Sequence, residues 1–291
     1  MTKTPEPRSQ NAAAIGVAAV LAALIAQNLG AAVAKQLFPL IGAYGVTAVR
    51  IAFSAGLLLM FRRPWRRPIP RSVIPALLGY GAMLGLMNLL IYQAFARIPI
   101  GIATGIEVTG PLAIVLLGSR RPRDFLWLAA AVAGLAMLLP IHAEAALDPI
   151  GIAFACGAAA CWALYIVYGK RVSITLGGDA VAWGMVVAAV LTLPIGLATA
   201  HAVLFQPWVL GIGLVVALLS SALPYSLEME AMRRLPAHVF AILLSAYPAV
   251  AALAGFLVLG ERLTLIQWLA ILCIMIASAG SAMTTGRTSS R

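Results

Sequence analysis

The fold is decided by two stretches that share one pattern, RIPIGIATGIEVTGPLAIVLLG (97–118) and RLPAHVFAILLSAYPAVAALAG (234–255). Each begins with Arg-x-Pro, carries a second proline in its interior (Pro111, Pro248) and ends in glycine, and the two lie 137 residues apart. Both are apolar over about the 20 residues that a membrane-spanning helix requires. The pair therefore predicts two copies of one membrane-embedded unit.

The rest of the chain extends this pattern. Hydrophobic residues make up 63% of the 291 residues, charged residues 10%, and the mean hydropathy is +1.00. Soluble domains are about 45–50% apolar and about 25% charged, so this composition excludes a soluble domain whose whole surface faces water. We expect an all-α membrane protein with ten transmembrane helices. The ten apolar runs cover residues 13–34, 41–61, 72–94, 98–118, 125–141, 150–169, 180–200, 208–228, 237–259 and 264–284.

Further matches predict where the two copies begin and end. The 137-residue offset also aligns Asp124 with Glu261, and an offset of 135 aligns Lys35 with Lys170. We expect two five-helix repeats, 13–141 and 150–284, between polar tails at 1–12 and 285–291. Because five is odd, the second copy enters the membrane from the opposite side, which gives the inverted repeat of many secondary transporters.

The basic residues predict the orientation. The net charge is +11, but the Lys and Arg residues cluster in short gaps between apolar runs, which argues against a nucleic-acid surface. With the N-terminus in the cytoplasm, only Lys35, Arg97 and Arg262 face the other side, and Arg50 lies inside a helix. The other sixteen of the 20 are then cytoplasmic, as the positive-inside rule requires. We expect a bacterial inner-membrane protein with both termini cytoplasmic.

Two charged residues lie in the middle of predicted helices. Glu107 lies four residues before Pro111, and a charge at that depth costs about 2.5–3.5 kcal/mol on insertion scales. Glu107 should therefore face the protein interior and be either paired or protonated, as a proton carrier or as a structural ion-pair partner. Arg50 could pair with Glu107 or hold a substrate carboxylate.

Proline and polar side chains predict the rest of a pathway. Pro111 and Pro248 interrupt equivalent helices, so they either line a transport cavity or form packing kinks. Embedded amides and aromatic residues either line the path or serve as interhelical bonds and interface anchors. Glu228 could instead join a solvated ion-pair cluster with Glu230, Arg233 and Arg234. The remaining candidates are Asn88, Tyr92, Trp162 and Tyr247, with a second group of Asn28, Gln93, Tyr225, Glu228 and Ser245.

Several chemistries lack a motif in this sequence. There is no Walker A sequence for ATP binding, no histidine spacing for a metal site and no Ser/His/Asp arrangement for hydrolysis. We expect no cofactor, no metal and no enzymatic activity.

The motifs resemble those of a known family. Two inverted five-helix halves are similar to the EamA type of the drug/metabolite transporter superfamily. The runs EVTGPLAIVLLGSRRPRDFLWL (107–128), SLEMEAMRRLP (226–236) and LGERLTLIQWLA (259–270) resemble bacterial threonine/homoserine exporters. The resemblance implies proton-coupled export of small amino acids, with Glu107, Glu228 and Pro248 at family positions. One departure is Tyr247, where the family usually has Glu, and this departure favours a less polar substrate.

The expected function is thus secondary active export of threonine- or homoserine-like amino acids or related metabolites. The expected partners are the substrate, protons and the lipid bilayer, with a homodimer as a further candidate. The alternative is efflux of drugs or toxic metabolites. A membrane-embedded enzyme and a non-transporting scaffold are remoter alternatives, the first because no reactive cluster is visible and the second because a scaffold needs no central break.

Overall fold

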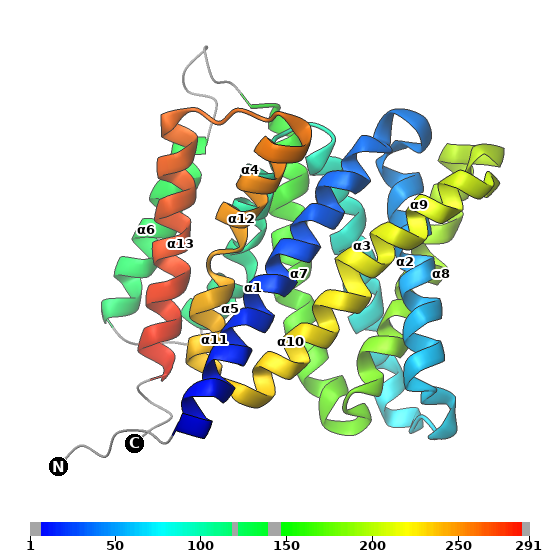
Figure 1. Cartoon of the computed structure of the whole chain (residues 1–291), viewed down its shortest axis with the longest axis horizontal. Helices are drawn as coiled ribbons and strands as arrows, with labels where there is room; N and C mark the ends of the chain where they lie inside the picture. The colour runs from blue at the N-terminus through cyan, green and yellow to red at the C-terminus, as the bar shows by residue number, and fades with distance from the viewer. Residues whose placement is uncertain (1–6, 118–121, 139–146, 287–291) are drawn as a thin grey trace.

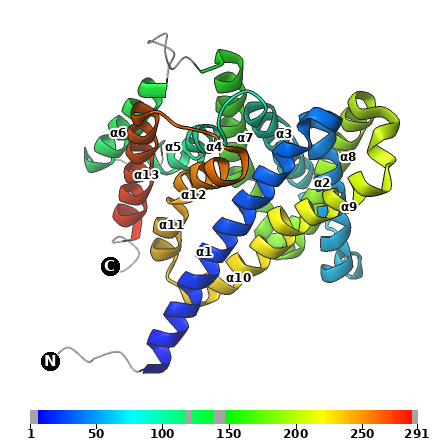
Figure 2. The ribbon, with the colours of Figure 1, turned by 45° about the horizontal axis from the view of Figure 1, so that its top comes forward.

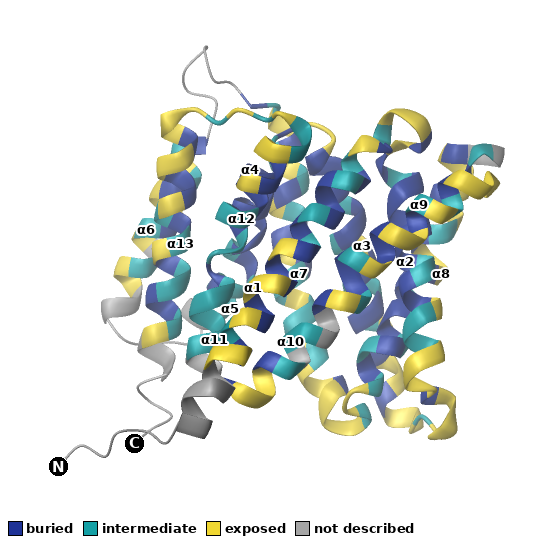
Figure 3. Ribbon diagram, in the orientation of Figure 1, coloured by how far each residue is buried: buried dark blue, intermediate teal, exposed yellow. Residues whose placement is uncertain are grey.

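The computed structural model describes residues 7–117, 122–138 and 147–286, and every regular element in these ranges is a helix. Within them, seven helices are long and apolar enough to cross a membrane. Three shorter apolar segments, Ile100–Ile114, Phe125–Leu138 and Pro207–Ala222, accompany them in one bundle (Figure 1). Exposed residues lie along the outside of the bundle (Figure 3). Large apolar side chains such as Leu257 and Leu265 are among the exposed residues. These findings confirm the prediction of an all-α chain with helices of membrane length.

The described residues of the first half form six α-helices. Two short 3₁₀ turns, η1 (Pro64–Arg66) and η2 (Arg71–Val73), link the second to the third. The helix predicted over 98–118 is divided in two at Val108. In order, the six are α1 (Pro7–Gln36), α2 (Phe38–Arg62), α3 (Ile74–Phe95), α4 (Ile100–Glu107), α5 (Thr109–Leu117) and α6 (Pro122–Leu138).

The described residues of the second half form seven α-helices with more interruptions than the first half. A 3₁₀ turn, η4 (His201–Phe205), precedes α9, and two π-helical turns, η5 (Leu218–Ala222) and η6 (Gly255–Leu259), follow α9 and α12. The α-helices are α7 (Pro149–Leu176), α8 (Asp179–Ala200), α9 (Pro207–Ala217), α10 (Leu223–Arg234), α11 (Ala237–Leu244), α12 (Tyr247–Ala254) and α13 (Leu265–Gly286).

The interior prolines coincide with breaks at equivalent places. A helical proline has no N–H to donate to the carbonyl four residues earlier, so that hydrogen bond is lost. Pro111 follows the break between α4 and α5, and Pro248 follows the break between α11 and α12. The segments before the breaks, α4 and α11, each have 8 residues. Their bounds differ by 137 positions, the offset found in the sequence.

The main helix contacts join one half to the other. These pairs are α2 with α8, α3 with both α7 and α8, α1 with α10, α4 with α12 and α6 with α13. The α1–α10 pair runs side by side in both views (Figures 1 and 2). Small residues permit the closest approaches: a Cβ on Gly110 of α5 would collide with the backbone carbonyl of Ala159 in α7. Most of the core, including Ile98, Ile100 and Ile102, lies where the two halves meet.

Helix ends differ from the sequence prediction where helices continue into polar sequence. Residues 7–12 of the predicted N-terminal tail belong to α1, which begins at Pro7. Similarly, α7 runs to Leu176, and α10 continues to Arg234. Hydropathy detects only the apolar part of a helix, whereas its backbone hydrogen bonds extend into flanking polar residues. Residues 139–141 of the predicted first repeat and 287–291 of the predicted C-terminal tail lie outside the described ranges.

The bundle has two distinguishable ends. The start of α1 and the end of α13 lie at one end, which we call the termini end, and the opposite end is the far end (Figure 1). The α2–α3 link and the ends of α7 and α10 also lie at the termini end, and they carry most of the described basic residues. The end of α1, the α3–α4 link and the segment before α13 lie at the far end.

Candidate functional site

A cavity of about 660 Å³ lies between the two halves. Its walls come from the long helices α1, α2, α3, α7 and α13, and from the shorter segments α4, α5, η5, α10, α11 and α12. Eight of the residues predicted from the sequence line it: Arg50, Asn88, Tyr92, Pro111, Trp162, Glu107, Glu228 and Tyr247. The geometry therefore brings both mid-membrane charges into one space.

Arg50 is fixed by neutral groups. It lies in α2 and is 6% exposed, and its Nη2 donates a hydrogen bond to Asn88 Oδ1. Asn88 is itself oriented because its Nδ2 donates a hydrogen bond to Leu84 O at 2.7 Å. The guanidinium also lies over the Tyr92 ring, with its Cζ 4.8 Å from the ring centroid. No carboxylate of the described residues forms an ion pair with Arg50.

Glu107 is the last residue of α4, beside the break. Pro111 cannot donate to its backbone carbonyl, and Val108 instead ends the segment by donating to Thr104 O at 3.0 Å. The Glu107 residue is 6% exposed, and its side chain lines the cavity without an ion pair to any described residue. Arg50 and Glu107 thus share the cavity as opposite charges but are not bonded to each other.

Aromatic side chains form much of the remaining wall. Tyr92 comes from α3, Trp162 from α7 and Tyr247 from the start of α12. Tyr165 stacks on Tyr80 with ring centroids 4.7 Å apart, and the Tyr80 hydroxyl donates to the Tyr165 hydroxyl at 2.9 Å. Such rings provide apolar contact area together with a hydroxyl or an N–H that can turn toward a polar ligand.

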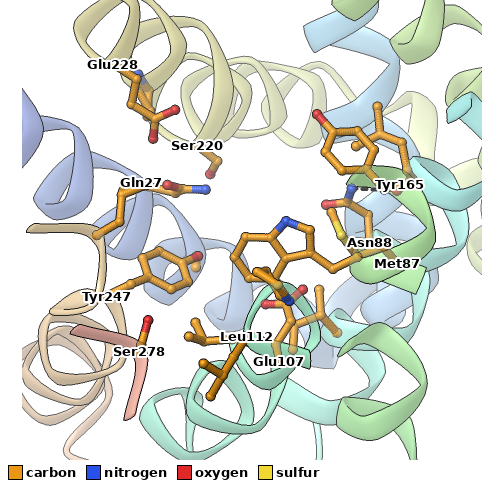
Figure 4. Close-up of a pocket in the computed structure, with 18 of the residues that line it drawn as sticks. Gln27, Met87, Asn88, Glu107, Leu112, Tyr165, Ser220, Glu228, Tyr247 and Ser278 are labelled. Atoms are coloured by element: carbon orange, nitrogen blue, oxygen red, sulfur yellow. Dashed lines mark hydrogen bonds between the residues drawn. The ribbon is translucent and has the colours of Figure 1, made fainter. Parts of the chain in front are cut away.

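Besides Ser281 of α13, three further polar residues line the cavity and were not among the predicted sites. They are Gln27 of α1, Ser220 of η5 and Ser278 of α13. Figure 4 shows them on one side with Tyr247 and Glu228, across from Asn88 and Tyr165. Their types carry little signal, because serine and glutamine are common in contacts between membrane helices. The cavity therefore has polar groups on opposing walls.

Four predicted residues do not line this cavity. Asn28 is fully buried and donates to Leu24 O, and Ser245 donates to Ile242 O at 2.6 Å. Gln93 lies near the far end, where its Oε1 accepts a hydrogen bond from Arg97. Pro248 packs behind the wall, close to Gly105. The side chain of one more predicted residue, Tyr225, lies outside the described part of the structure.

Glu228 and Glu230 separate in the structure, although the sequence placed both in one solvated cluster. Glu230 takes the ion pairs, with Arg234 Nη2 2.5 Å from its Oε1 and Arg233 Nη1 4.0 Å from its Oε2. Glu228 turns into the cavity (Figure 4) and forms no ion pair with the described residues. Two residues along a helix are about 200° apart, so the two carboxylates occupy opposite faces of α10.

At the far end, an ion pair joins the two halves. Lys35 at the end of α1 reaches Glu261, with Nζ and Oε1 2.7 Å apart, and also donates to Ile98 O at 3.2 Å. The second carboxylate oxygen of Glu261 accepts from Ile100 N at 3.0 Å, at the start of α4. These bonds join three segments above the cavity. The cavity itself extends the other way, to Glu228, Ser281 and Ala282 near the termini end.

The chain is similar to known transporters over most of its length. The profile of the EamA-like transporter family matches residues 149–283. The "Threonine/homoserine exporter RhtA" of Salmonella typhimurium (strain SL1344) is 47% identical over 269 residues, covering 92% of this chain and 91% of the relative. The Escherichia coli (strain K12) protein of the same name is 46% identical over 271 residues, covering 93% and 92%. A solved crystal structure with 20% identity and a TM-score of 0.58 covers 97% of this chain and 99% of its own, which supports the fold alone.

Proposed function

Because the chain belongs to the EamA-like transporter family, we propose that it exports small amino acids, of the threonine and homoserine kind, across the bacterial inner membrane. The single observation that carries this proposal is the central cavity. It places Glu107 and Arg50 together, at the membrane depth where charged residues are rare unless they serve a pathway. The names of the two exporters supply the substrate class.

We propose that the chain crosses the membrane ten times as two inverted five-helix repeats. The equal bounds of α4 and α11 after an offset of 137 support this. So does the pairing of helices: α3 packs on α7, the first helix of the second half, while α1 packs on α10, which continues the third helix of that half. A two-fold axis requires such reciprocal contacts. With both termini cytoplasmic, the basic termini end faces the cytoplasm.

In this arrangement the cavity is loaded from the cytoplasm and emptied at the far end. We propose that the Lys35–Glu261 pair closes the far end in this state, because it joins the two halves there while the cavity reaches toward the termini end. Glu107 alternates between binding the ammonium group of the substrate and binding a proton, so that proton entry drives export. Repeats of opposite orientation give two states of similar energy, one open to each side.

The test is transport in proteoliposomes. Reconstituted protein should move L-threonine and L-homoserine against their gradients when a pH gradient is imposed, and Glu107→Gln should abolish this coupling. A Glu230→Gln variant, altered outside the cavity, should behave like the wild-type protein. Undiminished gradient-driven transport by Glu107→Gln would remove Glu107 from the mechanism, and absence of amino-acid transport by the wild-type protein would refute the proposed substrate class.

Efflux of lipophilic cations is the second candidate. It is favoured by the aromatic wall formed by Tyr92, Trp162 and Tyr247, and by a volume larger than a small amino acid needs. Growth protection separates the two: overexpression should protect cells against toxic amino-acid analogues if the first proposal holds, and against lipophilic cations if the second does.

A further inference from the structure

Arg50 is buried, and none of the described residues forms an ion pair with its positive charge. Its guanidinium makes one hydrogen bond to the described residues, to the neutral amide of Asn88, and its Nε has no partner. The Tyr92 ring below it is also neutral overall. An arginine stays protonated even in a protein interior. A buried charge without an ion-pair partner is unfavourable, and Glu107 lines the same cavity without pairing with Arg50, so the guanidinium is suited to an anion that binds it directly.

The surroundings hold Arg50 in a fixed position for such an anion. Asn88 occupies one N–H of the guanidinium, and its own bond to Leu84 O at 2.7 Å prevents the amide from turning. The Tyr92 ring, itself 3% exposed, covers one face of the guanidinium. The guanidinium has five N–H donors in a planar fork, and the donors not used by Asn88 remain. A carboxylate is the anion whose two oxygens fit such a fork.

Glu107 complements this site from the same cavity. When ionised it carries the opposite charge, and it has no ion-pair partner among the described residues either. An α-amino acid has a carboxylate and an ammonium group in one small molecule, so it can neutralise both residues at once. A cation without a carboxylate would neutralise Glu107 and leave Arg50 uncompensated.

We infer that Arg50, held by Asn88 and Tyr92, binds the free carboxylate of the substrate and restricts transport to amino acids in which this group is unmodified. The inference rests on the proposed export of amino acids and adds the feature of the substrate that is recognised. Arg50 is the specificity-determining residue, and Asn88 is a positioning residue that acts through it.

The experiment compares L-threonine with L-threonine amide and L-threonine methyl ester as inhibitors of labelled L-threonine exchange in proteoliposomes. Losing two charge-assisted hydrogen bonds should weaken the amide and ester at least about 30-fold in the wild-type protein. Arg50→Gln should lose this discrimination, so that the three compounds compete within about threefold of one another. Arg97→Gln, at the far end, should keep it.

A second variant separates recognition from folding. Asn88→Asp places a carboxylate of similar size beside Arg50 and supplies the missing counter-ion from the chain. The new ion pair with Arg50 offsets the lost hydrogen bond to Leu84 O, so we expect this variant to keep a melting temperature close to that of the wild-type protein. It should bind L-threonine at least about tenfold more weakly, since its own carboxylate competes with the substrate. Retained threonine affinity in Asn88→Asp would show that Arg50 needs only an ion-pair partner, and would overturn the inference.

The outcomes also separate this inference from the proposed function. If the wild-type protein exchanges no L-threonine, amino-acid export itself fails. If it exchanges L-threonine and the amide and ester compete equally well, export stands and carboxylate recognition by Arg50 is refuted.

Discussion

Which of two adjacent polar residues lines the cavity depends on the rotation of their helix. Gln27 lines the cavity, whereas Asn28 is fully buried and satisfies part of its amide with Leu24 O. Successive residues on a helix point about 100° apart, so one polar residue faces the space between the halves and the next faces a neighbouring helix. Sequence reasoning selected Asn28 and missed Gln27, because residue type does not report the rotation of a helix.

The same rotation gives a prediction for Glu228. Its carboxylate faces the cavity near the termini end, where a substrate ammonium group would pass on entry, while Glu230 pairs with Arg234 outside. Glu228→Gln should raise the KM for L-threonine about fivefold, the effect of losing roughly 1 kcal/mol of charge attraction, with kcat little changed. Initial rates of uptake into inside-out vesicles measure this. An equal effect of Glu230→Gln would show that general surface charge is responsible.

Charged residues were the most predictable part of the site. Glu107 and Arg50 interrupt apolar runs, and the energetic penalty for a charge in the bilayer requires that both face the interior. Ser220 and Ser278 do not stand out in their apolar runs, because serine is tolerated in membrane helices. Only the packing of η5 and α13 reveals that these two residues line the cavity. The ion pairs of Glu230 likewise follow from its face on α10.

At the scale of elements, the broken helices are predictable because proline has a fixed chemical consequence. Pro111 and Pro248 each remove one backbone hydrogen bond, and the breaks before α5 and α12 follow. The kink at Gly42 in α2, with φ of 68°, was not predicted. A glycine inside an apolar run is as often a packing residue as a backbone irregularity, and only the structure distinguishes the two uses.

Close packing between α5 and α7 gives the second prediction. A Cβ at Gly110 would collide with the carbonyl oxygen of Ala159, and backbone atoms in two packed helices cannot easily move away. Gly110→Ala should therefore destabilise the protein by about 1–3 kcal/mol, measured by thermal unfolding in detergent. Gly56→Ala, in α2 with open space around it, is the matched control and should change stability by at most about 1 kcal/mol. Similar melting behaviour of the two variants would contradict the predicted collision.

At the scale of the whole molecule, the Lys35–Glu261 bond has a proposed counterpart. The sequence offsets relate Lys35 to Lys170 and Glu261 to Asp124, and an inverted repeat would place the second pair at the opposite end of the bundle. Lys170 is exposed near the end of α7, and Asp124 lies in the first turn of α6. The Lys170–Asp124 pair would close the termini end when the far end opens. The sequence relates the two pairs of residues, but it does not determine which end is closed, because that depends on the free-energy difference between two packings of similar energy.

Access to the cavity from each face is the most direct measurement of alternating transport. Gln27→Cys, in a background with Cys156, Cys161 and Cys273 replaced by Ala, would be labelled with a membrane-impermeant thiol reagent in right-side-out and inside-out vesicles. Labelling from the cytoplasmic side should be faster, and Lys35→Ala should accelerate labelling from the periplasmic side by weakening closure of the far end. Labelling from one face alone, unchanged by Lys35→Ala, would contradict a central cavity that opens to each side in turn.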